Sequence, residues 1–150
     1  MAAVRVPPDE PLRSILAALE AAGMVPVIGG SAVLAARGLV DVVNDWDIVV
    51  DADPDEVGGV LRGLGLFLGT PPNDPAFADD AFWRIDAGDH AIDVMVRFRI
   101  RTSAGEIVEI PARRGSTWND LPLARAEDWR IAYLAMGRTQ RAALLCDAAG

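Results

Sequence analysis

The sequence contains no lysine, one cysteine and one histidine, and the shortages of lysine and cysteine each exclude a kind of chemistry. Without lysine there is no amine for a Schiff base and no phosphate-binding lysine of the Walker type. The single cysteine, Cys146, excludes an internal disulfide. The longest run without a charged residue, 21–36, is interrupted by Pro26, Gly29 and Gly30. Because a membrane span needs about 20 apolar residues, the sequence predicts none.

Positive charge is also scarce. Arginine supplies all 14 basic residues against 22 acidic ones, and the net charge is −8. An acidic surface repels phosphate backbones, which excludes a protein that wraps duplex nucleic acid in a basic coat. Residues 1–10 lack the apolar core of a signal peptide, and this favours a cytoplasmic location. The length of 150 residues and the 51% hydrophobic content fit one globular domain over 1–150.

Apolar spacing, helix-start residues and glycine stops divide the chain into helices and strands. We expect helices over 11–22, 31–36, 53–64, 127–136 and 139–148, and strands over 24–28, 46–50, 82–86, 91–100 and 107–110. Residues 71–80 and 115–122 are expected to be irregular. The predicted fold class is therefore α/β (α+β), a mixed sheet flanked by helices. Its core spans about 11–112, and a short C-terminal helical segment spans about 125–149.

Two acids mark the predicted strand over 46–50: Asp45 directly precedes it and Asp47 lies within it. Asp45 and Asp47 point to the same face, because side chains two apart in a strand share a face. Neighbouring carboxylates repel each other and raise each other's pKa, and a divalent cation removes that conflict. The alternative is an acidic strand end that faces water.

A third acid, Asp93, lies inside an otherwise apolar strand, where an ionised carboxylate is costly unless it is paired or bound to a metal. If that strand continues unbroken, Asp93 shares its face with Arg97, Arg99 and Arg101. A carboxylate followed by guanidinium groups suits a site that holds metal and phosphate together. The alternative is a solvated basic strand in which one arginine pairs with Asp93.

Gly29, Gly30 and Ser31, here called the glycine turn, separate a predicted strand from a predicted helix. Glycine lets the backbone approach an anion closely, and a helix N-terminus offers free N–H groups to it. Taken alone, such a turn is typical of a simple connection between two elements.

Together, the glycine turn, the Asp-Trp-Asp segment thirteen residues later and the lone Asp93 in a later strand resemble the minimal nucleotidyltransferases of the DNA polymerase β superfamily. That group includes antibiotic nucleotidyltransferases and the nucleotidyltransferase-like toxins and antitoxins of abortive-infection systems. The resemblance covers about 24–97 through these motifs. It extends more loosely to the end of the chain through 122–124 and 127–129.

The resemblance implies a metal-dependent transfer of a nucleoside monophosphate from an NTP to a hydroxyl acceptor, with release of pyrophosphate. In it, Asp45 and Asp47 bind Mg²⁺, with Mn²⁺ as an alternative, and Asp93 completes the metal site and helps to deprotonate the hydroxyl. The nucleotide-binding residues are then Gly29, Gly30, Ser31, Arg97 and Arg99.

The resemblance leaves the acceptor open among a small cationic molecule, an RNA end and a protein hydroxyl. It also leaves open a homodimer or a toxin–antitoxin partner. Many relatives carry Arg and Thr where Asp41 and Val43 stand here, and a lysine in the C-terminal segment that this chain lacks. Arg37 or the arginines at 97–101 are the candidates to compensate. These departures and the small size favour one alternative, a binding protein with the same fold. A further alternative is a structural acidic domain whose carboxylates simply face water.

Five further residues have plainer interpretations. His90 is expected on a surface loop rather than as a base. Trp46 and Trp129 are expected in the core. Trp83 and Trp118 lie in less regular segments and are the better candidates to stack on a nucleobase.

Overall fold

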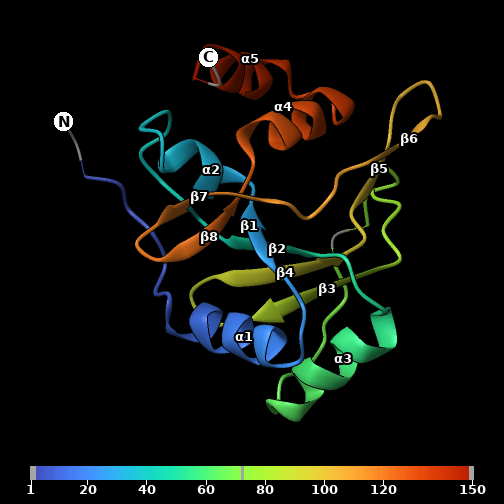
Figure 1. Ribbon diagram of the computed structural model, residues 1–150. Helices are drawn as coiled ribbons and strands as arrows, with labels where there is room; N and C mark the ends of the chain where they lie inside the picture. The colour runs from blue at the N-terminus through green and yellow to red at the C-terminus, as the bar shows by residue number, and fades with distance from the viewer. Residues whose placement is uncertain (1–2, 72, 149–150) are drawn as a thin grey trace.

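The computed structural model describes residues 3–71 and 73–148 (Figure 1). Residue 149 of the predicted C-terminal segment therefore lies outside the described residues. The helices are α1 (Glu10–Ala21), α2 (Ser31–Ala35), α3 (Pro54–Gly63), α4 (Ala126–Ala135) and α5 (Thr139–Ala148). The strands are β1 (Val27–Gly29), β2 (Trp46–Val50), β3 (Ala81–Asp86), β4 (Ala91–Val96), β5 (Arg99–Arg101), β6 (Ile107–Glu109), β7 (Arg114–Trp118) and β8 (Leu121–Ala124).

Six of the strands form one mixed sheet in the order β3-β4-β2-β1-β8-β7. The pairs β2–β4 and β1–β8 are parallel, and the other neighbours are antiparallel. The strands β5 and β6 form a separate antiparallel hairpin. The predicted α/β (α+β) class with a mixed sheet flanked by helices is confirmed.

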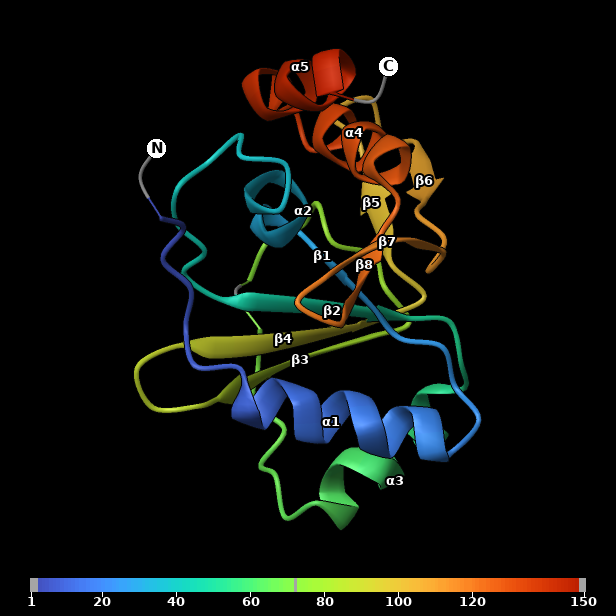
Figure 2. The same cartoon turned by 60° about the vertical axis from the view of Figure 1, so that its left-hand side comes forward.

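The helices cover both faces of the sheet, as Figure 2 shows, with α1 and α3 on one side and α2, α4 and α5 on the other. Because side chains alternate along a strand, the buried apolar residues also form two clusters, one on each face of the sheet. Ile48 and Val50 pack with the apolar stripe of α1, whereas Val49 and Met95 pack with residues of α4. Asp47 and Asp93 have the alternation of Val49 and Met95, and so they lie on the α4 face.

The start of α3 follows from local chemistry. The Asp53 side chain accepts hydrogen bonds from the backbone N–H groups of Asp55 and Glu56, at 2.9 and 3.2 Å, and thereby caps α3. In α1 the buried residues recur at helical spacing: Leu12, Ile15, Leu16 and Leu19. None of the helices in the described ranges is long and apolar enough to cross a membrane.

Two segments differ from the sequence prediction. Residues 115–122, expected to be irregular, largely belong to the β7–β8 hairpin, because Asn119 and Asp120 adopt the positive φ angles of 51° and 63° that a tight turn needs. The predicted strand over 91–100 is broken: β4 ends at Val96, and Arg97 has φ 52°.

The single histidine was expected on the surface and is instead buried, with 8% of its surface exposed. Its Nδ1 lies 2.8 Å from Asp89 Oδ1. Trp46 is buried as predicted, and its indole N–H donates to the backbone oxygen of Pro8 at 3.2 Å.

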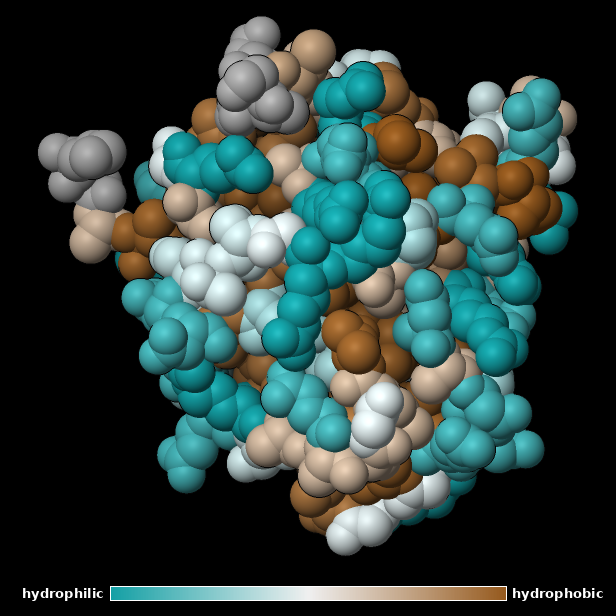
Figure 3. Space-filling model, in the orientation of Figure 1, coloured by the Kyte–Doolittle hydropathy of each residue, from teal (hydrophilic) through white to brown (hydrophobic). Residues whose placement is uncertain are grey.

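Polar side chains cover most of the face seen in Figure 1, with apolar surface showing between them near its centre (Figure 3).

Gly29 provides a test of how α4 packs on the sheet. A Cβ at this position would collide with the Trp129 indole, so we expect Gly29→Ala to destabilise the fold by about 1–3 kcal/mol. A Cβ at Gly59, inside α3, would meet nothing within 4 Å. The control Gly59→Ala should therefore be neutral or stabilising by up to about 1 kcal/mol. Urea unfolding of both variants measures the difference, and equal stabilities would contradict the packing of Trp129 on Gly29.

Candidate functional site

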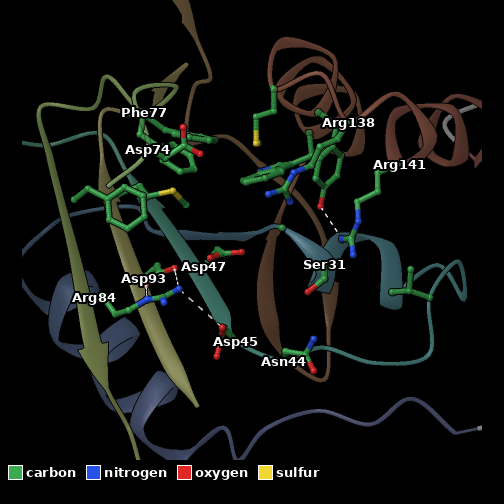
Figure 4. Close-up of a pocket in the computed structure, with 18 of the residues that line it drawn as sticks. Ser31, Asn44, Asp45, Asp47, Asp74, Phe77, Arg84, Asp93, Arg138 and Arg141 are labelled. Carbon is green, nitrogen blue, oxygen red and sulfur yellow. Dashed lines mark hydrogen bonds and ion pairs between the residues drawn. The ribbon is translucent and has the colours of Figure 1, made fainter. Parts of the chain in front are cut away.

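Strand register places the predicted acids side by side. Asp47 on β2 pairs with Asp93 on the parallel strand β4, Arg84 on β3 pairs with Asp93, and Gly29 on β1 pairs with Asp47. One row across four strands therefore reads Arg84, Asp93, Asp47 and Gly29. Asp45 lies two residues before Asp47 and shares its face (Figure 4). The structure thus brings Asp45, Asp47 and Asp93 together.

These acids line a cavity of about 560 Å³ between the sheet and the C-terminal helices. Part of the opposite wall is basic, since Arg138 follows α4 and Arg141 lies on α5 (Figure 4). Five of the nine aromatic side chains also line it: Phe77, Phe82, Phe98, Trp129 and Tyr133. The cavity therefore has an acidic floor, formed by Asp45, Asp47 and Asp93 on the sheet. The two arginines form a basic edge opposite this floor, and the five aromatic side chains form a wall. The volume of the cavity is that of a small-molecule site.

The glycine turn lies beside the acids. Gly30 has φ 66°, and a Cβ on it would collide with the Asp47 carboxylate, so only glycine lets that carboxylate rest against the turn. Gly30 and Ser31 line the cavity. Gly29 lies under the Trp129 indole instead. The nucleotide-binding role expected of these three residues stays a prediction.

Asp93 is held by Arg84. The guanidinium donates from Nε to Asp93 Oδ1 at 2.8 Å and from Nη2 to Oδ2 at 3.0 Å. The hydrogen bonds to Asp93 are the main cause that raises the pKa of Arg84 above its ordinary value. The second acid, Asp45, accepts the Ala91 backbone N–H at 2.8 Å and lies 4.0 Å from Arg84 Nη2. An arginine does pair with Asp93, but it comes from β3 and not from the expected row.

The ionised form of the third acid, Asp47, is disfavoured by its surroundings. Burial, and then the negative charges of Asp93 and Asp45, raise the pKa of Asp47 from 3.8 to about 7, whereas Arg84 and Arg138 act in the opposite direction. A carboxylate in this position favours a proton or another cation.

A divalent cation suits this set of donors, since carboxylate oxygens are the ligands that Mg²⁺ and Mn²⁺ take. Within residues 3–71 and 73–148, no three Asp, Glu, His or Cys side chains form a ready ligand cluster. Both oxygens of Asp93 accept hydrogen bonds from Arg84 in this arrangement. The roles of Asp45, Asp47 and Asp93 as metal ligands and catalytic residues stay predictions.

The expected row of arginines beside Asp93 does not form. The break at Arg97 turns the chain away from the sheet, and Arg97 and Arg99 both pair with Asp80, at 3.0 and 2.6 Å. Arg99 also pairs with Glu109 at 3.1 Å. Neither residue lines the cavity of the acids. The prediction assumed an unbroken strand, and the positive φ at Arg97 removes that assumption.

Sequence reasoning missed the arginines that do line the cavity. Arg84 carried a signal, because it stands within the predicted strand over 82–86 that neighbours Asp93 in sequence. Arg138 and Arg141 carried none, since their position depends on how α4 and α5 pack over the sheet. Arg141 Nη1 lies 3.5 Å from the Tyr133 hydroxyl, and its guanidinium lies 5.8 Å from the centre of that ring.

The tryptophans also divide differently from the prediction. Trp83 and Trp118, the expected stacking candidates, pack against the core on the α1 face and do not line the cavity. Trp129 is buried as expected, but it lines the cavity as well, in stacked contact with Phe98 at 5.4 Å between ring centres. Its indole Nε1 is buried without a hydrogen-bond partner.

The raised pKa of Asp47 predicts how stability depends on pH. The folded state holds this proton more tightly than the unfolded state, so Asp47 costs stability as pH rises from about 4 to about 7. Asp47→Asn removes that cost, and we expect it to stabilise the metal-free protein by up to about 4 kcal/mol at pH 8, since one pKa unit corresponds to about 1.4 kcal/mol. At pH 4 the gain should vanish. Urea unfolding at both pH values measures this, with Asp120→Asn in the exposed β7–β8 turn as the control; a gain that does not depend on pH would contradict it.

No protein-family model matches the sequence, and no curated protein matches it either. Solved structures do match. TM1012 of Thermotoga maritima, described as a nucleotidyltransferase, has TM-score 0.61 and 20% identity over 91% of this chain and 88% of its own. The antibiotic-resistance factor ANT(2'')-Ia has TM-score 0.62 and 15% identity, over 93% and 82%. The lincosamide antibiotic adenylyltransferase LnuA, with lincomycin bound, has TM-score 0.56 and 14% identity, over 92% and 96%. The chain therefore has the fold of the minimal nucleotidyltransferases, as its three sequence segments predicted.

Proposed function

We propose that the protein is a metal-dependent nucleotidyltransferase that moves a nucleoside monophosphate from an NTP to a hydroxyl acceptor. The observation that carries the proposal is the meeting of Asp45, Asp47 and Asp93 on one sheet face, at the floor of a cavity with arginines at its edge. The fold shared with nucleotidyltransferases supports the same conclusion.

In the proposed reaction the acceptor hydroxyl oxygen bonds to the α-phosphorus, and the bond from that phosphorus to the bridging oxygen of the β-phosphate breaks. Pyrophosphate leaves with the electron pair of that bond. The Asp93 carboxylate accepts the hydroxyl proton, which makes Asp93 the general base. Bound at Asp45, Asp47 and Asp93, Mg²⁺ or Mn²⁺ supplies positive charge for the phosphate oxygens in this transfer.

The triphosphate needs cations that the sequence did not obviously provide, since Asp41 and Val43 replace the Arg and Thr of many relatives. Arg138 and Arg141 supply them from the other side of the cavity, and Ser31 adds a hydroxyl donor. We therefore assign the triphosphate to the space between Ser31 and these two arginines.

The cavity favours a small acceptor. Its volume of about 560 Å³ is in the range of small-molecule pockets. The net charge of −8 favours a cationic molecule over an RNA end. Two proteins of the same fold are consistent with this class: ANT(2'')-Ia has been crystallised with adenylyl-2''-tobramycin, and LnuA is a lincosamide adenylyltransferase. Of the four NTPs, ATP is accordingly our first choice as the donor.

Thermal unfolding with each NTP, with and without Mg²⁺, tests the proposal. A ligand that binds the folded state raises Tm by mass action, so ATP with Mg²⁺ should raise it, by more than either component alone. In Asp47→Asn this shift, measured from the variant's own Tm, should be lost. Asp120→Asn, a loss of the same charge on an exposed turn, should keep it. No shift with any NTP would reject the nucleotide site and favour a partner-binding role for the fold.

The assignment of the triphosphate has a separate test. Arg138→Gln removes a cation from the cavity, and we expect the Kd for Mg²⁺–ATP to rise about tenfold, the scale of one hydrogen bond to a charged group. Arg130→Gln is the control, because Arg130 lies on α4 outside the cavity lining. Isothermal titration measures both, and an unchanged Kd in Arg138→Gln would remove Arg138 from the site.

A further inference from the structure

The ion pair between Arg84 and Asp93 raises a question that the proposed function leaves open. Asp93 is the acid that the reaction needs free, and yet both of its oxygens accept hydrogen bonds from one guanidinium. The fork of an arginine matches a carboxylate in this bidentate geometry, and its charge is permanent at any ordinary pH. The pair is therefore a strong, built-in interaction at the centre of the site.

Arg84 also lies close to a second acid of the site, and its charge acts on the third. Its Nη2 lies 4.0 Å from Asp45 Oδ2, and Asp47 pairs in register with Asp93 on the neighbouring strand. Three carboxylates on one face of the sheet would repel one another strongly without a cation among them. In the metal-free protein, the guanidinium occupies the electrostatic position that a divalent ion would fill.

The two partners differ in their freedom to move. The Arg84 side chain is 38% exposed and lines the cavity, whereas the Asp93 side chain is 8% exposed and fixed in the middle of β4. When the pair opens, Arg84 can turn into the cavity without leaving its charge buried. Asp93 has no comparable escape.

We propose that Arg84 is a positioning residue that holds Asp93 in the metal-free site and is displaced from it by the divalent cation. The inference rests on the proposed function, since it assumes that a divalent cation binds at these acids. The guanidinium and the metal ion compete for the same carboxylate oxygens. Arg84 thus offsets the repulsion among the acids in the folded, metal-free protein. By the same contacts it lowers the affinity of the site for the metal ion.

Mn²⁺ binding to the metal-free protein tests this competition without any need for an acceptor. The intensity of the free Mn²⁺ signal in electron paramagnetic resonance gives the Kd. We expect Arg84→Gln to bind Mn²⁺ more tightly than the wild type, on the order of tenfold, which is the scale of hydrogen bonds to a charged group. Arg84→Lys keeps the charge but loses the fork, and should lie between the two.

Two further variants isolate the cause. Arg13→Gln breaks a matched ion pair on α1, where Nε lies 2.9 Å from Asp9 Oδ2 and the arginine side chain is 40% exposed. It should leave the Kd for Mn²⁺ unchanged. In an Asp93→Asn background, Arg84→Gln should lose its effect, because the oxygens for which the two cations compete are then no longer charged.

The outcomes separate this inference from the proposed function. If the wild type binds Mn²⁺ and Arg84→Gln binds it equally or more weakly, competition is wrong while the metal site stands. If neither protein binds Mn²⁺, both are wrong. Should Arg84→Gln fail to fold, Arg84→Lys decides, since competition predicts tighter binding than in the wild type and a purely structural role predicts equal or weaker binding.

Discussion

Repulsion among three carboxylates is the constraint around which this molecule is arranged. Parallel pairing of β2 and β4 places Asp47 beside Asp93, and strand alternation adds Asp45 to the same face. Such a row on a sheet that α4 and α5 cover is tolerated only where cations are near. Arg84 forms an ion pair with Asp93, and the positive charge of Arg138, across the cavity, lowers the pKa of Asp47. The negative charge that remains unbalanced is that of Asp47, whose pKa stays raised to about 7.

The rest of the fold makes room for these charges. On β2 and β4, the apolar side chains of one face of the sheet pack towards α1 and α3. The other face can therefore carry acidic side chains that point towards the cavity. Gly30 lets the Asp47 carboxylate lie against the glycine turn, and Gly29 lets Trp129 approach the sheet. The contact between Trp129 and Gly29 packs α4 on the sheet. Arg138 and Arg141, which follow Trp129 in the chain, then lie across the cavity from the acids (Figure 4). Packing and the proposed chemistry therefore depend on the same few close approaches.

The acidic half of the site could be predicted from sequence, because Asp47 and Asp93 lie on strands, Asp45 directly precedes one, and strand alternation is a local property. The basic half could not. Arg97 and Arg99 shared the face of Asp93 only if the strand ran on, and a positive φ at Arg97 is set by how the chain turns towards β5 rather than by local preference. Arg138 and Arg141 reach the cavity through the docking of two helices, which no periodicity reveals. The β7–β8 hairpin was likewise missed, because an Asn-Asp turn gives a weaker signal than one with glycine.

The most direct test of the account is to locate a paramagnetic ion on the protein in solution. Mn²⁺ broadens the amide signals of residues near it in ¹H–¹⁵N NMR spectra. The account predicts broadening of Gly30, Ser31, Asp45, Asp47 and Asp93, with sharp signals retained in α3, whose acidic first turn lies on the opposite face of the sheet. Preferential broadening at Asp53, Asp55 and Glu56, with the signals of β2 and β4 unchanged, would contradict it.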